Sequence, residues 1–379
     1  MHFASRFYER LLASDRFIDA VGAARRAAWE ARPAGNTWAA YQCYGDPEWR
    51  YVPPDTAATP QAAAVPDVAS APALALVLEN EALEARYANA PTRASRNRRL
   101  RLLNQLQARY QSEWGGIGAV AEAFGLAYAE CGDIDTAIDW YRRALGANDG
   151  SASLKAAEQL CNQLARRAGA AAVDDTAGVQ ARADIGEAIE RLRHLVALHS
   201  TVEREQLLGS AFKRLAMIEA GPASVAALKS AVQHYGNAEA MVRAGLGDDL
   251  YYPVMNGIAA ALRIAVQQGS GATPLDAGRM EAARQGLQSR LSRSPDFWSL
   301  AGPIEMRWLD AVSGKRLAAA RADIEQAFAE LAQRAAAPRM WASVHDQARF
   351  VLEPYAQKAD GAERAAATAL LKQLKALAA

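Results

Sequence analysis

The 379-residue sequence has 51% hydrophobic and 22% charged residues, an ordinary globular composition that excludes a largely disordered chain. Forty-three basic residues balance forty-two acidic ones, so the chain lacks the long-range field on which non-specific binders of nucleic acid or anionic membranes depend. The length leaves room for two or three domains with a sizeable core.

The cysteines and the N-terminus indicate a cytoplasmic protein. Cys43, Cys131 and Cys161 are odd in number and widely spaced, which predicts reduced thiols in place of a disulfide framework or a thiolate zinc site. Charged residues interrupt the first turns, so no signal peptide is predicted, and no apolar run reaches the roughly 18 residues of a membrane span. We expect no cofactor, no metal and no membrane partner.

The first elements in the chain are two helices and a short strand. Apolar residues at helical spacing predict helices over residues 3–13 and 16–32. Residues 38–44 are rich in aromatics and are followed by a Gly-Asp-Pro turn at residues 45–47, which predicts a strand. An isolated strand leaves its backbone groups unpaired, so this strand implies a sheet that the chain does not encode.

The segment around this strand reads Asn36-Thr37-Trp38-Ala39-Ala40-Tyr41-Gln42-Cys43-Tyr44-Gly45-Asp46-Pro47. It resembles the closing strand of CHAT domains, the caspase-like peptidase modules that occur beside tetratricopeptide (TPR) repeats, and departs mainly at Ala39, where the family usually has Gly. The resemblance implies that residues 1–52 are the C-terminal remnant of such a domain, whose earlier part is missing. The structural positions that carry it are Asn36, Thr37, Trp38, Tyr41, Gln42, Tyr44, Gly45, Asp46 and Pro47.

A change of composition marks the clearest domain boundary. Residues 53–72 are rich in proline and alanine, and proline favours extended geometry, so a semi-rigid linker is predicted. From residue 73 to residue 379 the pattern is helical with short Gly, Pro, Asp or Ser breaks, which is typical of antiparallel helix pairs. The predicted helices are roughly 73–89, 93–112, 116–131, 134–147, 152–168, 182–199, 203–219, 223–240, 250–268, 276–293, 302–312, 317–335, 339–356 and 361–377.

One stretch of this helical region, residues 118–151, has the spacing of the TPR consensus. Small residues would let its two helices cross closely, tyrosines would fill the space beside them, and a glycine would end the first helix. The signature residues are Gly125, Tyr128, Gly132, Ala137, Tyr141 and Ala144.

Partial copies of this unit follow along the chain. The pattern that begins at Asp133 recurs 51 residues later at Asp184, and Gly209 and Tyr235 suggest a further pair of helices. We therefore expect a mostly α fold, an irregular TPR-like α-solenoid of antiparallel helix pairs, preceded by a small α/β remnant of a caspase-like domain. An all-helical bundle with one coincidental match is the alternative.

A second, weak likeness lies further along the chain. Residues 248–256 are slightly similar to a motif in the TPR-like TRAF-binding region of some mitogen-activated kinase kinase kinases. A structural account is also available, because Pro253 suits the first turn of a helix whose N-terminus the aspartates at 248 and 249 favour.

The sequence contains no catalytic or metal-binding motif. Cys43 lies in the strand motif, whereas the reactive Cys and His of the CHAT family come from earlier strand ends, so we expect a packing role for Cys43. His194 and His199 are five residues apart and do not share one helical face. The patterns His-Glu-x-x-His, Cys-x-x-Cys and Gly-x-Ser-x-Gly do not occur.

Four positions are candidates for partner binding. Glu122 and Asn162 lie on predicted first helices, whose side chains line the groove of TPR-like arrays. Arg96 and Arg99 belong to an arginine-rich helix, whose charges usually form a solvated face. As a site, this helix would fit an acidic peptide or partner domain better than nucleic acid, because no interleaved aromatics offer base stacking.

The sequence therefore favours a non-catalytic function. We expect a protein-interaction or regulatory module, the C-terminal part of a bacterial protein of the CHAT–TPR type, which binds a partner protein or peptide on a helical-repeat surface. The alternative is a caspase-like cysteine peptidase whose His–Cys dyad lies in a missing upstream segment. The identity of the partner and the oligomeric state stay open.

Overall fold

The structure is a computed structural model that describes residues 2–33, 35–51, 66–87, 92–170, 175–269, 274–293, 295–333 and 338–378. These residues form seventeen helices, and no β-sheet is found among them. The chain divides into two compact units, unit 1 up to Pro66 and unit 2 from Asp67 onward. The mostly helical fold is thus confirmed. Most of the predicted linker, residues 53–65, lies outside the described residues.

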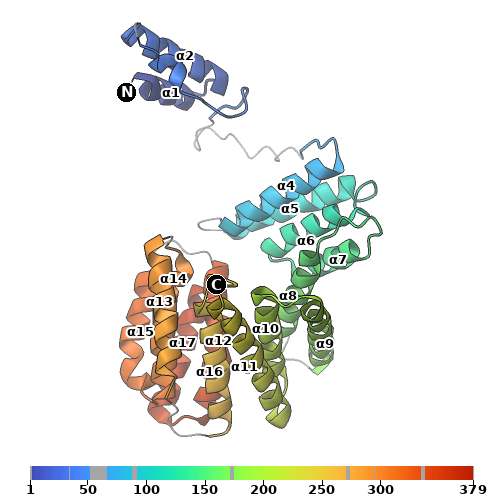
Figure 1. Cartoon of the computed structure of the whole chain (residues 1–379), viewed down its shortest axis with the longest axis vertical. Helices are drawn as coiled ribbons and strands as arrows, with labels where there is room; N and C mark the ends of the chain where they lie inside the picture. The colour runs from blue at the N-terminus through green and yellow to red at the C-terminus, as the bar shows by residue number, and fades with distance from the viewer. Residues whose placement is uncertain are drawn as a thin grey trace. The chain divides into compact units, whose positions relative to one another are not determined.

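Unit 1 is a small helical unit with an aromatic core. Phe3 of the first helix packs with Ala24 and Ala28 of the second. The ring of Phe3 also stacks on that of Tyr41, with ring centroids 4.2 Å apart. The helices of unit 1 are α1 (His2–Leu12), α2 (Phe17–Ala31) and the single turn α3 (Thr37–Ala40) (Figure 1).

The strand predicted over residues 38–44 is wrong. Thr37–Ala40 forms a helical turn, and residues 41–44 have no regular secondary structure. A strand needs a neighbouring strand to satisfy its backbone groups, and the described residues provide none. The α/β remnant expected for residues 1–52 is therefore replaced by a helical unit with one isolated β-bridge between Arg16 and Arg50.

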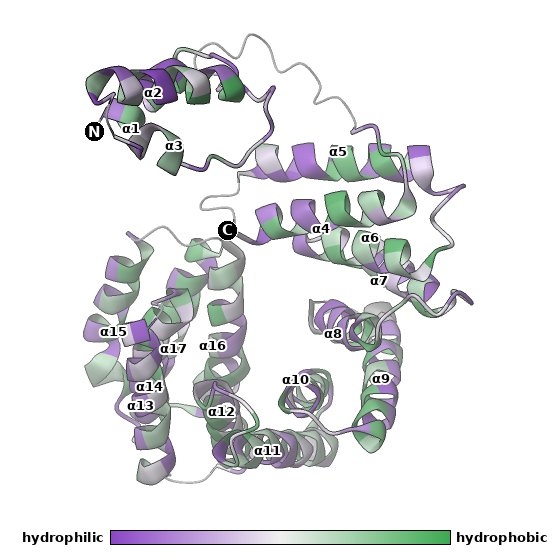
Figure 2. Ribbon diagram, turned by 45° about the horizontal axis from the view of Figure 1, so that its top comes forward, coloured by the Kyte–Doolittle hydropathy of each residue, from purple (hydrophilic) through white to green (hydrophobic). Residues whose placement is uncertain are grey.

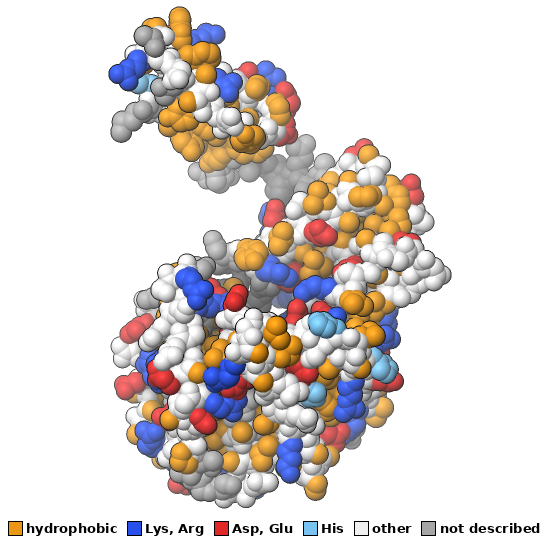
Figure 3. Space-filling model, viewed as in Figure 1, with side chains coloured by type: hydrophobic (Ala, Val, Ile, Leu, Met, Phe, Trp, Pro, Cys, Tyr) orange, Lys and Arg blue, Asp and Glu red, His pale blue; other side chains and the backbone are white. Residues whose placement is uncertain are grey.

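Unit 1 leaves much of its aromatic surface uncovered. Tyr44 is 85% exposed, and Trp29, Trp38 and Trp49 are exposed as well. Hydrophobic side chains accordingly gather on the face of unit 1 seen in Figure 3. The segment that resembles a sheet strand thus presents its aromatic side chains at the surface of this unit.

Unit 2 begins with a curved stack of helix pairs. In Figure 2 the first helices α8 and α10 lie on the inner side of the curve, and their second helices α9 and α11 lie on the outer side. We call the inner side the inner face. The helices of this stack are α4 (Ala71–Tyr87), α5 (Arg93–Tyr110), α6 (Gly118–Glu130), α7 (Ile134–Leu145), α8 (Leu154–Ala170), α9 (Asp175–Leu198), α10 (Val202–Ile218), α11 (Gly221–Arg243) and α12 (Tyr251–Gln267).

Two of these pairs depend on a close crossing between a glycine and a tyrosine. A Cβ atom on Gly125 of α6 would lie 2.9 Å from Cδ1 of Tyr141 on α7. A Cβ atom on Gly209 of α10 would lie 2.9 Å from Cε2 of Tyr235 on α11. Both tyrosine side chains are buried. Since any larger residue would push the ring away, glycine is what allows each pair of helices to approach this closely.

Gly132 ends α6 in the left-handed conformation, with φ of +79°. The next residue turns the chain into α7, because the Asp133 backbone N–H donates to Tyr128 O at 3.0 Å. The Asp133 carboxylate then accepts a hydrogen bond from the backbone N–H of Thr136 at 3.2 Å, which caps the new helix.

The partial copy at Asp184 has a different local structure. The sequence predicts a helix from residue 182, but α9 begins at Asp175. Asp184 therefore lies inside the helix and caps nothing, although it aligns with the capping residue Asp133. Its carboxylate is free to bind a side chain of the neighbouring helix instead.

Five further helices complete unit 2, and one of them returns to the stack. Helix α16 packs against both α17 and α12, so the C-terminal pair contacts the array directly (Figure 2). These helices are α13 (Ala277–Arg293), α14 (Phe297–Ser313), α15 (Leu317–Ala332), α16 (Pro338–Lys358) and α17 (Gly361–Leu377).

We predict that Gly125→Ala lowers the free energy of unfolding by about 1–3 kcal/mol, because the new methyl group displaces the Tyr141 ring. Gly186→Ala is the matched control. It lies inside α9, where the added methyl group meets no neighbour within 4 Å, and it should raise stability by up to about 1 kcal/mol through helix propensity. Urea unfolding followed by circular dichroism measures both values. Equal effects of the two substitutions would contradict the close crossing.

Candidate functional site

The two predicted groove residues, Glu122 and Asn162, lie on α6 and α8. The Glu122 carboxylate is already engaged, since it accepts hydrogen bonds from the Ser153 backbone N–H at 2.8 Å and from Ser153 Oγ at 2.6 Å. Asn162 is half-buried, and its side chain makes no hydrogen bond to another described residue. A partner contact at either position stays a prediction, and only Asn162 has its side chain unengaged within the described chain.

The two predicted arginines also have partners within the chain. Arg96 donates from Nε to Cys131 O at 2.7 Å and from Nη2 to Gly132 O at 3.0 Å, so it satisfies carbonyls at the C-terminal end of α6. Arg99 binds Glu84 at 3.0 Å and Glu81 at 3.4 Å, which joins α5 to α4. The arginine-rich helix therefore holds its neighbours together.

The terminal motif of unit 1 makes local contacts. The backbone N–H of Glu48 donates to Asp46 Oδ1 at 2.9 Å, which closes the turn after α3. Cys43 packs against the core cluster of α1 and α2 that Phe3 belongs to. The side chain of Thr37 lies outside the described residues. Within unit 1 the motif thus contributes packing and a turn.

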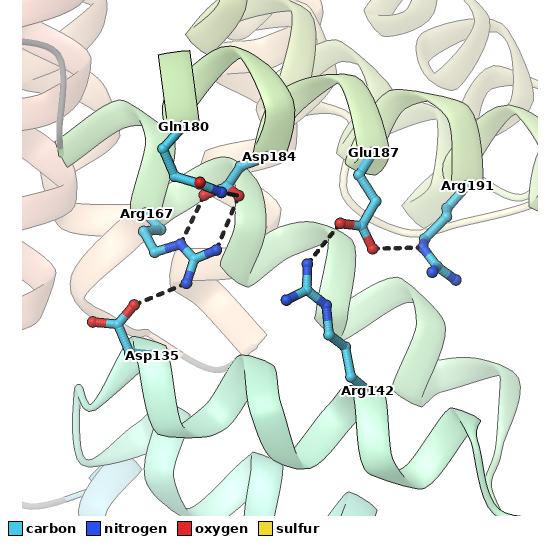
Figure 4. Close-up of polar contacts among 7 residues, drawn as sticks. All are labelled: Asp135, Arg142, Arg167, Gln180, Asp184, Glu187 and Arg191. Atoms are coloured by element: carbon cyan, nitrogen blue, oxygen red, sulfur yellow. Dashed lines mark hydrogen bonds and ion pairs between the residues drawn. The ribbon is translucent and has the colours of Figure 1, made fainter. Parts of the chain in front are cut away.

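An ionic network joins α7, α8 and α9 (Figure 4). Arg167 of α8 forms a bidentate pair with Asp184 of α9, from Nε at 2.7 Å and from Nη2 at 2.9 Å. Its third nitrogen, Nη1, donates to Asp135 of α7 at 2.9 Å. Gln180 adds a hydrogen bond to Asp184 at 2.7 Å. Because Asp184 is only 2% exposed, this one guanidinium neutralises a buried carboxylate and ties three helices together.

Two further ion pairs connect neighbouring helix pairs. Arg142 of α7 binds Glu187 of α9 at 2.7 Å (Figure 4). Arg204 of α10 binds Glu158 of α8 at 2.7 Å, and both side chains are nearly buried. Arg204 also donates from Nη1 to His199 O at 2.6 Å, at the end of α9. A buried pair of this kind opposes any sliding of α10 along α8, since a shift would leave both charges uncompensated.

Lys213 of α10 is the centre of a polar contact between the stack and the C-terminal helices. Its ammonium group donates to Asn256 Oδ1 of α12 at 2.8 Å and to Gln347 Oε1 of α16. Gln347 in turn donates from Nε2 to Glu305 Oε1 of α14 at 2.7 Å. We call these four residues the Lys213 junction. It brings four helices to one point.

The environment of Lys213 disfavours its charged form. Burial of the ammonium group, followed by the nearby positive charge of Arg214, lowers the pKa of Lys213 to about 7. The ring of Phe350, 4.8 Å from Nζ, compensates only part of the lost hydration. Lys213 therefore changes its charge near neutral pH.

Two arginines beside the junction hold α16 in place. Arg263 of α12 donates to Phe350 O of α16 at 2.8 Å and to Ala216 O of α10 at 3.3 Å. Burial lowers the pKa of Arg263 to about 10. Arg349 of α16 donates to Gly169 O, near the end of α8, at 3.2 Å. The Nε atoms of both arginines are buried and have no hydrogen-bond partner among the described residues. This region therefore contains two unsatisfied hydrogen-bond donors.

A groove of about 800 Å³ opens beside Arg263. Helices α10, α11, α12 and α16 contribute its walls, and side chains of both charges line it. Such a lining suits a polar peptide better than an apolar ligand. No cluster of His, Cys, Asp and Glu in the described part of the chain has the make-up of a metal site. The lining includes Glu219, Lys229, Gln267, Glu353 and Lys358.

The Lys213 junction was not found by sequence reasoning. Lys213 and Gln347 are 134 residues apart, and no local pattern links them. Two signals were present without being decisive. Lys213 lies one turn after Gly209 on a predicted first helix, and Asn256 ends the weakly similar segment 248–256. Gln347 reaches Lys213 only because α16 packs back against α12.

We predict that Asp184→Asn lowers the free energy of unfolding by about 1.5–3 kcal/mol, because the bidentate, charge-assisted pair between Arg167 and the buried Asp184 is lost. Asp135→Asn removes the other carboxylate from the same guanidinium. Since the Asp135 side chain is 79% exposed, that substitution should cost less than about 1 kcal/mol. Urea unfolding of the two variants under identical conditions compares them. A larger loss for Asp135→Asn would rule out the assigned role of Asp184.

We predict that the contribution of Lys213 to stability rises with pH. Folding lowers its pKa from 10.5 to about 7, so between these values the unfolded chain binds a proton that the folded chain does not. The free energy of unfolding then increases with pH, by at most about 1.4 kcal/mol per pH unit, and below about pH 7 this contribution is constant at its lowest value.

Lys213→Met removes this dependence. The difference in free energy of unfolding, wild type minus variant, should therefore grow between about pH 7 and about pH 9. Urea titrations at several pH values measure it. A difference that stays level or falls over this range would show that Lys213 is not desolvated in the folded protein.

Comparison with known proteins identifies one similarity. Residues 133–263 match the model of a family described as Tetratricopeptide Repeats-Sensor (TPR-S). The matched segment runs from α7 to the middle of α12 and contains Lys213 and Asn256. Among curated proteins, none matches the chain. No helix within the described ranges is long and apolar enough to cross a membrane. Less than half of the chain is therefore similar to TPR-S, and repeats of the TPR type are typical of protein-interaction modules.

Proposed function

We propose that this chain is a non-catalytic interaction module that binds a segment of a partner protein on its inner face. The observation that carries the proposal is the repeated crossing of a glycine and a tyrosine, at Gly125 and at Gly209. Gly209 lies inside the segment similar to TPR-S, and Gly125 lies shortly before it. Stacked pairs of this kind place their first helices side by side, and such helices form the binding surface of TPR-like arrays.

The chemistry of the inner face supports an acidic segment as the bound partner. Lys213, Arg214 and Arg349 bring three basic groups to the meeting point of α8, α10 and α16. Arg349 keeps a buried Nε without a partner among the described residues. Asn162, on α8, offers an unengaged amide on the same row of first helices. The positive charges of Arg214 and Arg349 would attract a peptide carboxylate.

The wider setting is also a proposal. The segment from Asn36 to Pro47 supports an origin in a bacterial CHAT–TPR type protein, in which the helical part responds to a partner and controls a peptidase. The word sensor in the description of the TPR-S family agrees with a regulatory role. The cytoplasm is the location that we propose, and the mixed distribution of charges over unit 2 in Figure 3 favours a protein partner over nucleic acid.

The state of the thiols supports binding in preference to catalysis. Burial raises the pKa of Cys131 to about 11 and that of Cys161 to about 12, which keeps both as unreactive thiols at neutral pH. Cys43 contacts the core of unit 1. The competing function, a caspase-like peptidase, would depend on a His–Cys dyad supplied by another segment.

Site-specific photo-crosslinking tests the binding surface. With benzoylphenylalanine in place of Asn162, ultraviolet light should capture one defined protein from cells that make this chain, and Arg349→Gln should reduce the yield because an acidic segment loses a donor. The matched control carries the same probe in place of Leu198, which is exposed on α9 of the outer side. This control should capture the protein poorly.

Two results would overturn the proposal. Equal capture from positions 162 and 198 would show that the inner face is not the binding surface. Peptide hydrolysis by the purified chain that disappears in Cys43→Ala would show that the chain is an enzyme.

A further inference from the structure

Helix α5 is strongly basic, and its arginines differ in their contacts. Its 18 residues include six arginines and no acidic residue. Arg96 and Arg99 bind groups of α6 and α4, and Arg109 pairs with Asp67 at 2.6 Å. The other three arginines are exposed and make no hydrogen bond or ion pair with any described residue. Within the described chain, three positive charges of this helix are therefore uncompensated.

The unpaired arginines share one side of the helix. At 100° per residue, the exposed residues of α5 other than Arg96 fall within a sector of about 160° around its axis. The buried residues Leu103, Leu106 and Tyr110 lie on the opposite side. No residue in the exposed sector is acidic, and its only apolar side chains are those of alanine. We call this sector the outer α5 face. It consists of Arg93, Ala94, Asn97, Arg98, Arg101, Asn104, Gln105, Ala108 and Arg109.

These charges do not stabilise the helix that carries them. Arg93 lies in the first turn of α5, where the positive end of the helix dipole favours an acidic side chain, and that turn contains none. Arg98 and Arg101 are three residues apart, a spacing at which like charges repel each other on a helix. Proteins commonly retain locally unfavourable features of this kind at functional surfaces. The outer α5 face is therefore a candidate for contact with a negatively charged partner.

Carboxylates of a protein suit this face better than the phosphates of a nucleic acid. Guanidinium groups bind both kinds of anion through paired hydrogen bonds. The face contains no aromatic side chain for base stacking. It is also short, with about 24 Å between the first and the last arginine. Glu113 follows its C-terminal end and Glu84 of α4 lies beside Arg99, and both are exposed. A long polyanion would meet these carboxylates.

The chemistry of the face also indicates the form of the bound segment. Large apolar side chains usually anchor a folded domain or an amphipathic helix at an interface, and the outer α5 face has none. Binding therefore depends on charge and hydrogen bonds. An extended chain covers 24 Å with about seven residues. The side-chain amides of Asn97 and Gln105 make no hydrogen bond to another described residue and are open to its backbone.

We propose that the outer α5 face binds a short, extended acidic segment of a partner protein. Its aspartate or glutamate side chains pair with Arg93, Arg98 and Arg101, and its backbone bonds to the interleaved amides. Helix α5 is not one of the helices that form the inner face, so the proposal does not depend on the function proposed for that face.

Unit 1 is a poor source of such a segment. Residues 1–51 contain seven arginines and six acidic residues, so unit 1 has no surplus of negative charge. Four of the six acidic side chains are already paired with arginines of unit 1. These four are Glu9, Asp15, Asp19 and Glu48.

Fluorescence anisotropy on the full-length chain tests the proposal. The probe is a rhodamine-labelled peptide of eight residues with six glutamates, blocked at its C-terminus. The comparison peptide has glutamine in place of each glutamate. The glutamate peptide should bind at least about tenfold more tightly than the glutamine peptide, and this advantage should shrink as salt is added.

Surface variants assign the binding to α5. The double variant Arg98→Gln, Arg101→Gln should weaken the glutamate peptide at least about tenfold through two lost ionic contacts. Arg307→Gln is the matched control, because Arg307 is an exposed arginine of α14 without a partner among the described residues. It should leave the affinity unchanged. Arg349→Gln should also leave it unchanged, which separates α5 from the inner face. Circular dichroism verifies that each variant keeps its helices.

Four outcomes would overturn the proposal. The first is equal affinity for the two peptides, and the second is an unchanged affinity in the double variant. If Arg349→Gln abolishes that unchanged binding, the peptide occupies the inner face, and the function proposed there is supported instead. The third outcome is a DNA duplex that displaces the peptide at a lower concentration of negative charge than unlabelled peptide does. The fourth is a dimer in analytical ultracentrifugation that dissociates in the double variant, because a second copy of the chain would then occupy the face.

Discussion

Where a tyrosine ring lies directly against the backbone of a glycine, two helices approach more closely than any larger residue at the glycine position would permit. Unit 2 uses this contact twice, between Gly125 and Tyr141 and between Gly209 and Tyr235. Because both crossings bury the ring completely, each pair of helices becomes one thin, rigid layer. Layers of this shape stack with their first helices on one side, and the inner face follows from that stacking.

Charged contacts then determine how successive layers meet. Arg167 of α8 binds Asp135 in the preceding layer and Asp184 in its own layer. Arg204 of α10 binds Glu158 of α8 and so joins two successive layers. Apolar packing alone would tolerate small shifts of one layer along the next. The buried guanidinium of Arg204 opposes such shifts, since each hydrogen bond that it loses leaves a charge without compensation. The stack therefore combines a general apolar contact with specific ionic ones.

The two ends of unit 2 differ in how far they are closed. At the C-terminal end α16 turns back onto α12, and the Lys213 junction fills the contact with polar groups that are only partly compatible with burial. At the N-terminal end α4 exposes Leu76, Leu83 and Tyr87, which no other described helix of unit 2 covers. Polar groups that are under-satisfied and apolar groups that are exposed both cost stability, and functional surfaces are where proteins commonly retain such features.

The sequence by itself determined the features that act over a few residues. The spacing of Gly125, Tyr128 and Tyr141, the stop at Gly132 and the long helical pattern all reflect local geometry, and they predicted the helical fold correctly. The prediction of a strand around Trp38 was wrong, because the backbone groups of a strand form their hydrogen bonds only with a partner strand, and the described residues contain none. Only the tertiary structure decided that Arg96 and Arg99 bind neighbouring helices and that Gln347 meets Lys213. These contacts depend on where distant helices return in space, and residue spacing carries no information about that return.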